Sequence, residues 1–158
     1  MPVREYTETK LQMSISDYLG GKIHNGKNVT HVQVPFPGLL WSYLGGEGRN
    51  SSDIYWLSRK GRRKGIYDYA AWHSDIAPTA FETKSKNGYL SPEQIAFKNA
   101  FEAMGGITCI ILSVAEVRDF YIGLGLKCMN MHCIEPPATF REKQSGYFEM
   151  LKADYENT

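Results

Sequence analysis

The sequence predicts an α/β fold, in which helices flank a mixed β-sheet, and two observations lead to this prediction. Residues 69–72 form a short apolar run and residues 79–84 alternate as a strand does, so the two are expected to pair as a hairpin across residues 73–78. The apolar, β-branched run at residues 107–112 suits a buried strand and has an expected helix on either side. This order is typical of α/β layer folds, and it places the third strand parallel to residues 79–84 through a right-handed helical crossover.

The two helices around the third strand have clear start signals. Residues 91–94 supply a serine cap, a proline at the first helical position and a glutamine that completes a capping box. Gly105 and Gly106 end this helix, whose apolar stripe consists of Phe97, Ala100, Phe101 and Met104. A second capping box begins at Ser113, and its helix is expected to run to about Leu124.

A further helix is expected at residues 5–19, before the strands. Its apolar stripe recurs at helical spacing and consists of Leu11, Ile15, Tyr18 and Leu19. Glu8 and Gln12 lie on the same side of the helix. A carboxylate there can reach into a neighbouring site, or it can simply complement the helix dipole in the first turn.

The segment between this helix and the hairpin is less regular. Residues 29–34 alternate weakly and are compatible with a strand that ends at Pro35. The apolar residues 39–44 are interpreted as a helical turn within a glycine-rich loop, and Ser51 or Ser52 starts a short helix. Near the end of the chain, residues 140–155 are expected to form a last helix.

The composition is that of a globular protein. The 158 residues suit a single domain, and their 42% apolar and 22% charged content is ordinary for this class. The net charge of +1 gives no global field for nucleic acid, so any basic surface must be local. No apolar run approaches the length of a membrane span, and no secretory leader is visible. Three cysteines argue against a disulfide framework and for a reducing compartment, so a cytoplasmic location is expected, or the host cytoplasm for a viral protein.

An acidic pair and a lysine give the first functional signal. Glu82 and Lys84 project from the same face of their strand, and Asp68 lies at the head of the strand that pairs with it. The hairpin therefore brings the three charged groups to one end of the sheet. Two carboxylates and an ammonium suit a hard divalent cation and an anionic substrate. The alternative is an ordinary exposed ion pair.

A cluster of basic residues leads directly into Asp68. It consists of Arg59, Lys60, Arg62, Arg63 and Lys64, with Gly61 and Gly65 among them. Such clusters supply most of the affinity for phosphate, and glycines let the backbone approach the polyanion. The alternative is a solvated surface loop.

Three cysteines and one histidine offer a second, weaker signal. Cys128, His132 and Cys133, with Cys109 as a fourth ligand, permit a zinc interpretation, but adjacent ligands and the lack of a CxxC pair disfavour it. Buried cysteines on a strand are the alternative. The other histidines have no partner at metal or triad spacing.

Three motifs in sequence resemble one nuclease family. KGIYD at 64–68, FETK at 81–84 and GYLSPEQ at 88–94 are similar to the VRR-NUC family of the PD-(D/E)XK group, which has a restriction-endonuclease-like fold. The match covers residues 61–118. The sequence departs from the family at Tyr67, where proline is usual, and this exchange loosens the turn without removing a chemical group.

The resemblance implies roles for individual residues. Asp68 and Glu82 correspond to the metal-binding carboxylates, with the Thr83 carbonyl as a further ligand, and Lys84 corresponds to the catalytic lysine. Gln94 and Glu8 complete the catalytic set. The implied cofactor is Mg²⁺ or Mn²⁺, with no organic cofactor. The DNA-binding residues are then Lys60, Arg62, Arg63 and Lys64.

The resulting hypothesis is a metal-dependent deoxyribonuclease that acts on branched DNA. Stand-alone members of the family resemble Holliday-junction resolvases of DNA repair, so a homodimer is expected, with apolar material from residues 39–44 and from Tyr147, Phe148, Leu151 and Tyr155. Both segments could instead pack within one monomer. The rivals are a nuclease for linear or single-stranded DNA and a non-catalytic DNA-binding module with a vestigial site. In this interpretation residues 1–158 form one nuclease domain with a C-terminal extension at 127–158.

Overall fold

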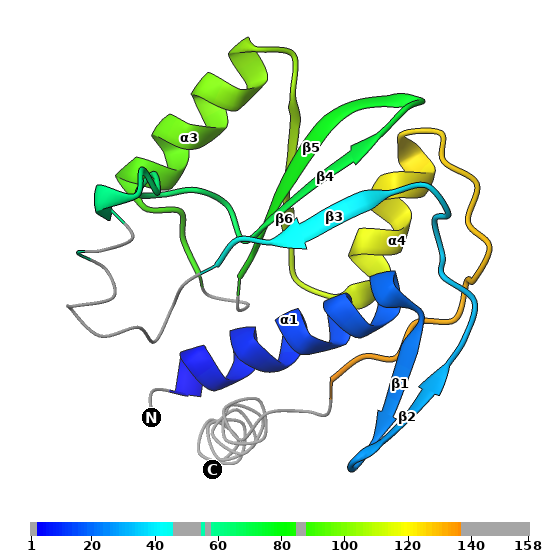
Figure 1. Ribbon diagram of the computed structural model, residues 1–158. Coiled ribbons are helices and arrows are strands. Elements are labelled where there is room, and N and C mark those ends of the chain that lie inside the picture. The colour runs from blue at the N-terminus through cyan, green and yellow to red at the C-terminus, as the bar shows by residue number, and fades with distance from the viewer. Residues whose placement is uncertain (1–2, 46–54, 56–57, 85–87, 137–158) are drawn as a thin grey trace, which may run out of the picture.

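The computed structural model describes residues 3–45, 55, 58–84 and 88–136, with the side chains of the first helix described from residue 8. Its centre is a four-stranded sheet in the order β3-β4-β5-β6 (Figure 1). The strands are β3 (Leu40–Tyr43), β4 (Tyr69–His73), β5 (Ile76–Thr83) and β6 (Ile107–Ile111). The pairs β3–β4 and β4–β5 are antiparallel, and β6 runs parallel to β5. The predicted α/β fold with a mixed sheet and flanking helices is confirmed.

Two helices cover one face of the sheet, and a third covers the other. The main core lies between the sheet and the helices α1 (Val3–Gly20) and α4 (Val114–Gly123). Within it the rings of Tyr69 and Phe81 stack at a centroid distance of 4.6 Å. The helix α3 (Pro92–Ala103) packs on the opposite face, where Phe97 contacts Tyr67 and Ala80.

Local sequence signals explain the helices well. The stripe predicted for the first helix is buried in α1, and Glu8 and Gln12 are buried beside it, with 6% and 7% of their surface exposed. Ser91 caps α3 in a complete capping box with Gln94. Ser113 caps α4 by accepting a hydrogen bond from the Glu116 amide. These three helices confirm their predictions to within a few residues.

A second sheet of two strands stands apart from the first. The strands β1 (Lys22–Asn25) and β2 (Asn28–His31) pair as an antiparallel hairpin, which projects from the end of α1 (Figure 1). The tip turns through Gly26, whose φ is 61°. Only β2 overlaps the expected strand at 29–34, and β1 was missed because its exposed polar residues lack a regular pattern.

The prediction of a helical turn at residues 39–44 is wrong, because residues 40–43 form β3. Trp41 and Tyr43 share one face of this strand and both contact the ring of Tyr69 on β4. Pairing with β4 therefore decides the conformation of this short apolar run. The alternation of aromatic residues was the signal that favoured a strand.

Two further expectations need correction. The hairpin loop is shorter than residues 73–78, because β5 begins at Ile76 and continues through Pro78 beside a break in the β4–β5 register. The third strand is not fully buried, because β6 lies at the edge of the sheet and leaves Ile110 partly exposed, and it ends at Ile111, before the exposed Leu112. The helices predicted at 52–57 and 140–155 fall largely or wholly outside the described residues. Within the described part of the chain, no helix is long and apolar enough to cross a membrane.

Candidate active site

The residues that the sequence nominates meet at the end of the β4–β5 hairpin. Asp68 directly precedes β4, Glu82 and Thr83 end β5, and Lys84 follows. Asp68, Glu82 and Lys84 are 3%, 1% and 7% exposed. The alternative of an ordinary exposed ion pair is therefore excluded, since the ionic groups have been withdrawn from water.

Both oxygens of the Glu82 carboxylate accept hydrogen bonds. Its Oε2 accepts from the main-chain amide of Asp68 at 2.9 Å, and its Oε1 accepts from the Gln94 side chain at 2.6 Å. The Lys84 ammonium lies 3.4 Å from the same Oε1. Gln94 therefore has two roles, because its own Oε1 also accepts from the Ser91 amide in the capping box at 2.9 Å. The start of α3 is thereby tied to the acidic pair.

Asp68 is held from the neighbouring strand by Thr83. Its Oδ2 accepts from the Thr83 amide at 3.0 Å and from the Thr83 hydroxyl at 2.6 Å. The sequence interpretation assigned Thr83 only a carbonyl ligand role, and that role stays a prediction. The structure adds a second role, in which the Thr83 side chain orients the Asp68 carboxylate.

A chain of hydrogen bonds extends from Thr83 to the edge of the sheet. The Gln12 side-chain amide donates to the Thr83 hydroxyl at 3.0 Å, and the Tyr43 hydroxyl donates to the Gln12 carbonyl oxygen at 3.2 Å. The Leu44 amide, one residue farther along, donates to the main-chain oxygen of Asp68 at 2.6 Å. Sequence reasoning noted Gln12 on the buried stripe of the helix but missed Tyr43, because the strand that carries it was misassigned.

Glu8 reaches this region from α1. Its charge is among the causes that raise the pKa of Asp68, although burial is the largest cause and the Thr83 hydrogen bonds act in the opposite direction. The predicted proximity of the first helix to the acidic pair is therefore seen in the structure. Its role in a reaction stays a prediction.

The surroundings of Asp68 and Glu82 disfavour the state in which both carboxylates are ionised. Burial, followed by the nearby Asp68 carboxylate, raises the pKa of Glu82 to about 8, while the Lys84 ammonium lowers it. Two buried carboxylates that resist joint ionisation favour a cation between them, because a cation removes the repulsion.

The acidic pair opens to the surface through a depression of about 290 Å³. Asp68 and Glu82 line it, together with Arg62, Lys64 and Gln94. Arg62 donates to the Leu44 carbonyl at 3.2 Å, and Lys64 pairs with Glu93 at 3.1 Å. The other predicted DNA-binding residues are placed differently: Arg63 lies over the ring of Phe97, and Lys60 is exposed outside the depression.

Gly65 brings the basic loop against the start of α3. Its φ is 83°, and a Cβ atom at this position would overlap the main-chain carbonyl of Glu93. No other residue type fits both requirements without moving the backbone. Two residues after Gly65, Tyr67 is fully buried against Phe97, so the residue that departs from the family pattern adds core packing. In the described part of the chain, its hydroxyl is a buried polar atom without a hydrogen-bond partner.

The donors at the site fit a hard divalent cation. Carboxylate oxygens of Asp68 and Glu82 face one depression, and Mg²⁺ typically takes one or two carboxylates while it keeps several waters. Among the described residues, no three His, Cys, Asp or Glu side chains gather as a metal-ligand group. Asp68 and Glu82 are the residues that would hold the cation, and it would supply charge neutralisation and an acidified water; the Thr83 carbonyl stays a predicted third ligand.

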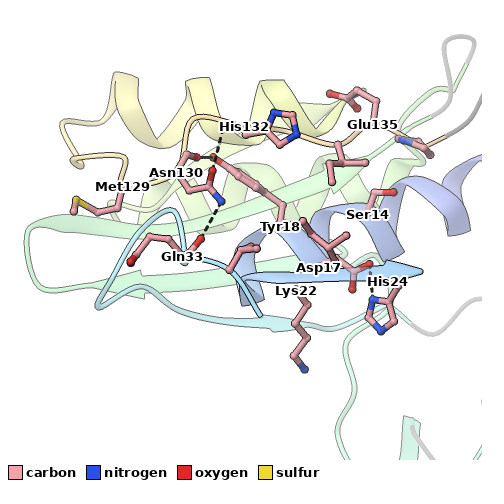
Figure 2. A pocket seen from close by; sticks show the side chains of 14 residues that line it. Ser14, Asp17, Tyr18, Lys22, His24, Gln33, Met129, Asn130, His132 and Glu135 are labelled. Atoms are coloured by element: carbon pink, nitrogen blue, oxygen red, sulfur yellow. Dashed lines mark hydrogen bonds and ion pairs between the residues drawn. The ribbon is translucent and has the colours of Figure 1, made fainter. Parts of the chain in front are cut away.

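A second, larger cavity lies away from the acidic pair (Figure 2). It holds about 450 Å³ between α1, the β1–β2 hairpin and residues 129–136. Its polar groups bond to one another: Tyr18 donates to the Asn130 carbonyl at 2.6 Å, and the Asn130 side chain donates to the Gln33 carbonyl at 3.0 Å. Glu135 accepts from two amides at the start of α4. These contacts fix residues 129–136 to the domain.

The zinc interpretation rested on three cysteines, which are partly buried and pack against the main core: Cys109, Cys128 and Cys133.

The chain is similar to a solved structure. A solved structure described as a "VRR_NUC domain protein" has a TM-score of 0.48 and 20% sequence identity, over 75% of this chain and 90% of that chain. Its description names the family that the three sequence motifs resemble. No family model matches the sequence, and no curated protein matches it.

Proposed function

We propose that this protein is a metal-dependent endonuclease that hydrolyses phosphodiester bonds in DNA. The observation that carries the proposal is the buried Asp68–Glu82 pair beside Lys84, at the floor of a depression that Arg62 and Lys64 line. Carboxylates of this kind hold Mg²⁺ or Mn²⁺, which neutralises a scissile phosphate and acidifies water. The basic side chains at the rim suit the phosphates on either side.

Four residues around the two carboxylates have separate roles in the proposed reaction. Lys84, held 3.4 Å from Glu82, is placed to stabilise negative charge that grows on the phosphate. Gln94 and Thr83 keep the two carboxylates in position through their hydrogen bonds. Glu8 adds negative charge beside Asp68 from the α1 side.

The preferred substrate in this proposal is branched DNA, such as a four-way junction, cut by a homodimer. The support is the resemblance in sequence to a family whose stand-alone members are similar to junction resolvases. The structure leaves Leu40 on the edge strand β3 68% exposed, which suits a contact between copies, whereas Leu39 and Trp41 pack against the core of their own chain. Light scattering at micromolar concentration tests the dimer.

Cleavage assays test the reaction itself. Purified protein is incubated with Mg²⁺ or Mn²⁺ and with duplex, single-stranded or four-way-junction DNA. Asp68→Asn and Glu82→Gln should abolish cleavage and leave the fold intact, while Glu93→Gln, at a half-exposed carboxylate of the same depression, should retain activity. Cleavage that persists in the Asp68 and Glu82 variants, or in chelator, would exclude the proposed site. DNA binding without any cleavage by the native protein would favour the non-catalytic binding module.

A further inference from the structure

A groove on the α1 side of the sheet adjoins the acidic pair. It holds about 520 Å³, and the residues that line it come from α1, the tip of the β1–β2 hairpin, β3 and β4. Tyr43 and Gly45, two residues apart, line the groove and the depression respectively. Likewise Tyr69 lines the groove, and Asp68, the residue before it, lines the depression. Gln12, which also lines the groove, donates to the Thr83 hydroxyl that bonds to Asp68, so hydrogen bonds connect the groove lining to the acidic pair.

The surface of the groove is aromatic and apolar. Met13 is 56% exposed and Tyr43 is 40% exposed. The carboxylate of Asp17, which also lines the groove, is paired with His24 at 3.0 Å, as Figure 2 shows from the neighbouring cavity. The groove therefore offers an exposed aromatic ring and a thioether to a ligand.

The hairpin that forms one wall is positively charged. Residues 18–45 contain no aspartate or glutamate, and the hairpin carries Lys22 and Lys27, both exposed, together with His24 and His31. His24 and Gly26 of the hairpin line the groove and Lys27 follows Gly26 at the tip, whereas Lys22 lines the neighbouring cavity. A polyanion is the partner that this charge distribution accepts.

We propose that the groove binds an unpaired stretch of the nucleic-acid strand next to the bond to be cut, with a base against Tyr43 and Met13 and phosphates along the hairpin. The proposal rests on the proposed nuclease function and names a second contact region for its substrate. An unpaired strand fits better than a duplex, because the lining offers stacking surface, whereas a duplex requires cations along both backbones. The substrate then extends from the basic depression, past the acidic pair, to the groove.

Binding in the absence of divalent metal tests the proposal apart from the chemistry. Fluorescence anisotropy in chelator compares a labelled single-stranded oligonucleotide with a duplex of the same length. Tyr43→Leu should weaken single-strand binding by roughly 5- to 160-fold, which is the range for loss of one base–aromatic stack. Tyr43→Phe, which keeps the ring and removes only the hydroxyl bonded to Gln12, should bind as the native protein does. Trp72→Leu, an exposed aromatic at the other end of β4, is the matched control.

Met13→Glu gives an independent measurement at an exposed helical position, where the fold tolerates the change. It should also weaken single-strand binding, while Ile122→Glu on α4 should have no effect. Native binding by both Tyr43→Leu and Met13→Glu would overturn the proposal, and so would an equal loss for duplex and single strand. These outcomes are separate from the proposed function, because a failure to cleave DNA appears in the metal-dependent assay and not in this one.

Discussion

The Glu82 carboxyl should make the metal-free protein less stable at high pH. Its pKa is about 8 in the folded protein against an ordinary value of 4.5, chiefly because the side chain is buried and then because Asp68 lies nearby. Between pH 4.5 and about pH 8, the Glu82 carboxyl therefore stays protonated in the folded protein, whereas it is already ionised in the unfolded chain. The associated stability is fully present below pH 4.5 and is lost as the pH rises through 8.

The size of this effect follows from the two pKa values. At about 1.4 kcal/mol for each pH unit, a shift from 4.5 to about 8 corresponds to roughly 5 kcal/mol of unfolding free energy. Glu82→Gln removes the ionisation and keeps an acceptor for the Asp68 amide. The variant should therefore gain stability relative to the native protein as the pH is raised from 5 to 9, by several kcal/mol at most.

Urea unfolding followed by tryptophan fluorescence, in chelator at pH 5, 7 and 9, measures this difference. Glu102→Gln is the matched control, because Glu102 is exposed and its pKa is lowered, chiefly by the Thr108 hydroxyl, so its loss should bring no gain at pH 9. Ca²⁺ or Mg²⁺ should stabilise the native protein increasingly toward pH 9 and leave Glu82→Gln unaffected. A Glu82→Gln variant that is destabilised equally at all three pH values would refute this account of the carboxyl pair.

Three further predictions concern the groups that support the site. Gly65→Ala should lower the unfolding free energy by about 2 kcal/mol or more, because φ at this position is positive and the new Cβ would overlap the Glu93 main chain. Chemical denaturation measures the loss. Gly61→Ala is the control, since φ is also positive there but nothing lies within 4 Å of the new Cβ. Gln94→Leu should cost about 1 kcal/mol through the lost cap and should weaken Ca²⁺ binding in calorimetry, whereas Lys98→Leu on the same helix should leave Ca²⁺ affinity unchanged. Arg62→Ala and Lys64→Ala should each reduce the slope of log affinity for DNA against log salt by about 0.9. Lys60→Ala, outside the depression, should change this slope less. Equal slopes for all three variants would mean that the basic loop is an ordinary solvated surface without a specific phosphate contact.

Much of the site could be predicted because its signals are local. Glu82 and Lys84 are two residues apart on one strand, so alternation alone places them together, and the observed ion pair confirms it. Gln94 belongs to a capping box that is legible in four residues. To place Asp68 beside Glu82 and Lys84, it was also necessary to predict that β4 pairs with β5. The short connection between these two strands made this pairing predictable.

The parts that were missed depend on contacts between distant residues. β3 has only four residues, and its conformation is decided by pairing with β4 across a segment that includes the basic loop. Propensity in so short a run is weaker than this pairing, so the helical interpretation failed there. The error concealed Tyr43, and with it the hydrogen bonds that join β3 through Gln12 and Thr83 to Asp68.

The end of β3 has a larger part in the site than its length indicates. Tyr43 bonds to α1, the Leu44 amide bonds to the Asp68 carbonyl, and the Leu44 carbonyl accepts from Arg62 of the basic loop. One short segment thus contacts the helix, the acidic residue and the phosphate-binding loop of the proposed function. Because all three contacts come from one segment, a displacement of this segment by a bound strand would act on Asp68 and on Arg62 together. Tyr43→Phe removes only the first of the three contacts, so its effect on Ca²⁺ affinity measures how far the groove and the acidic pair are coupled.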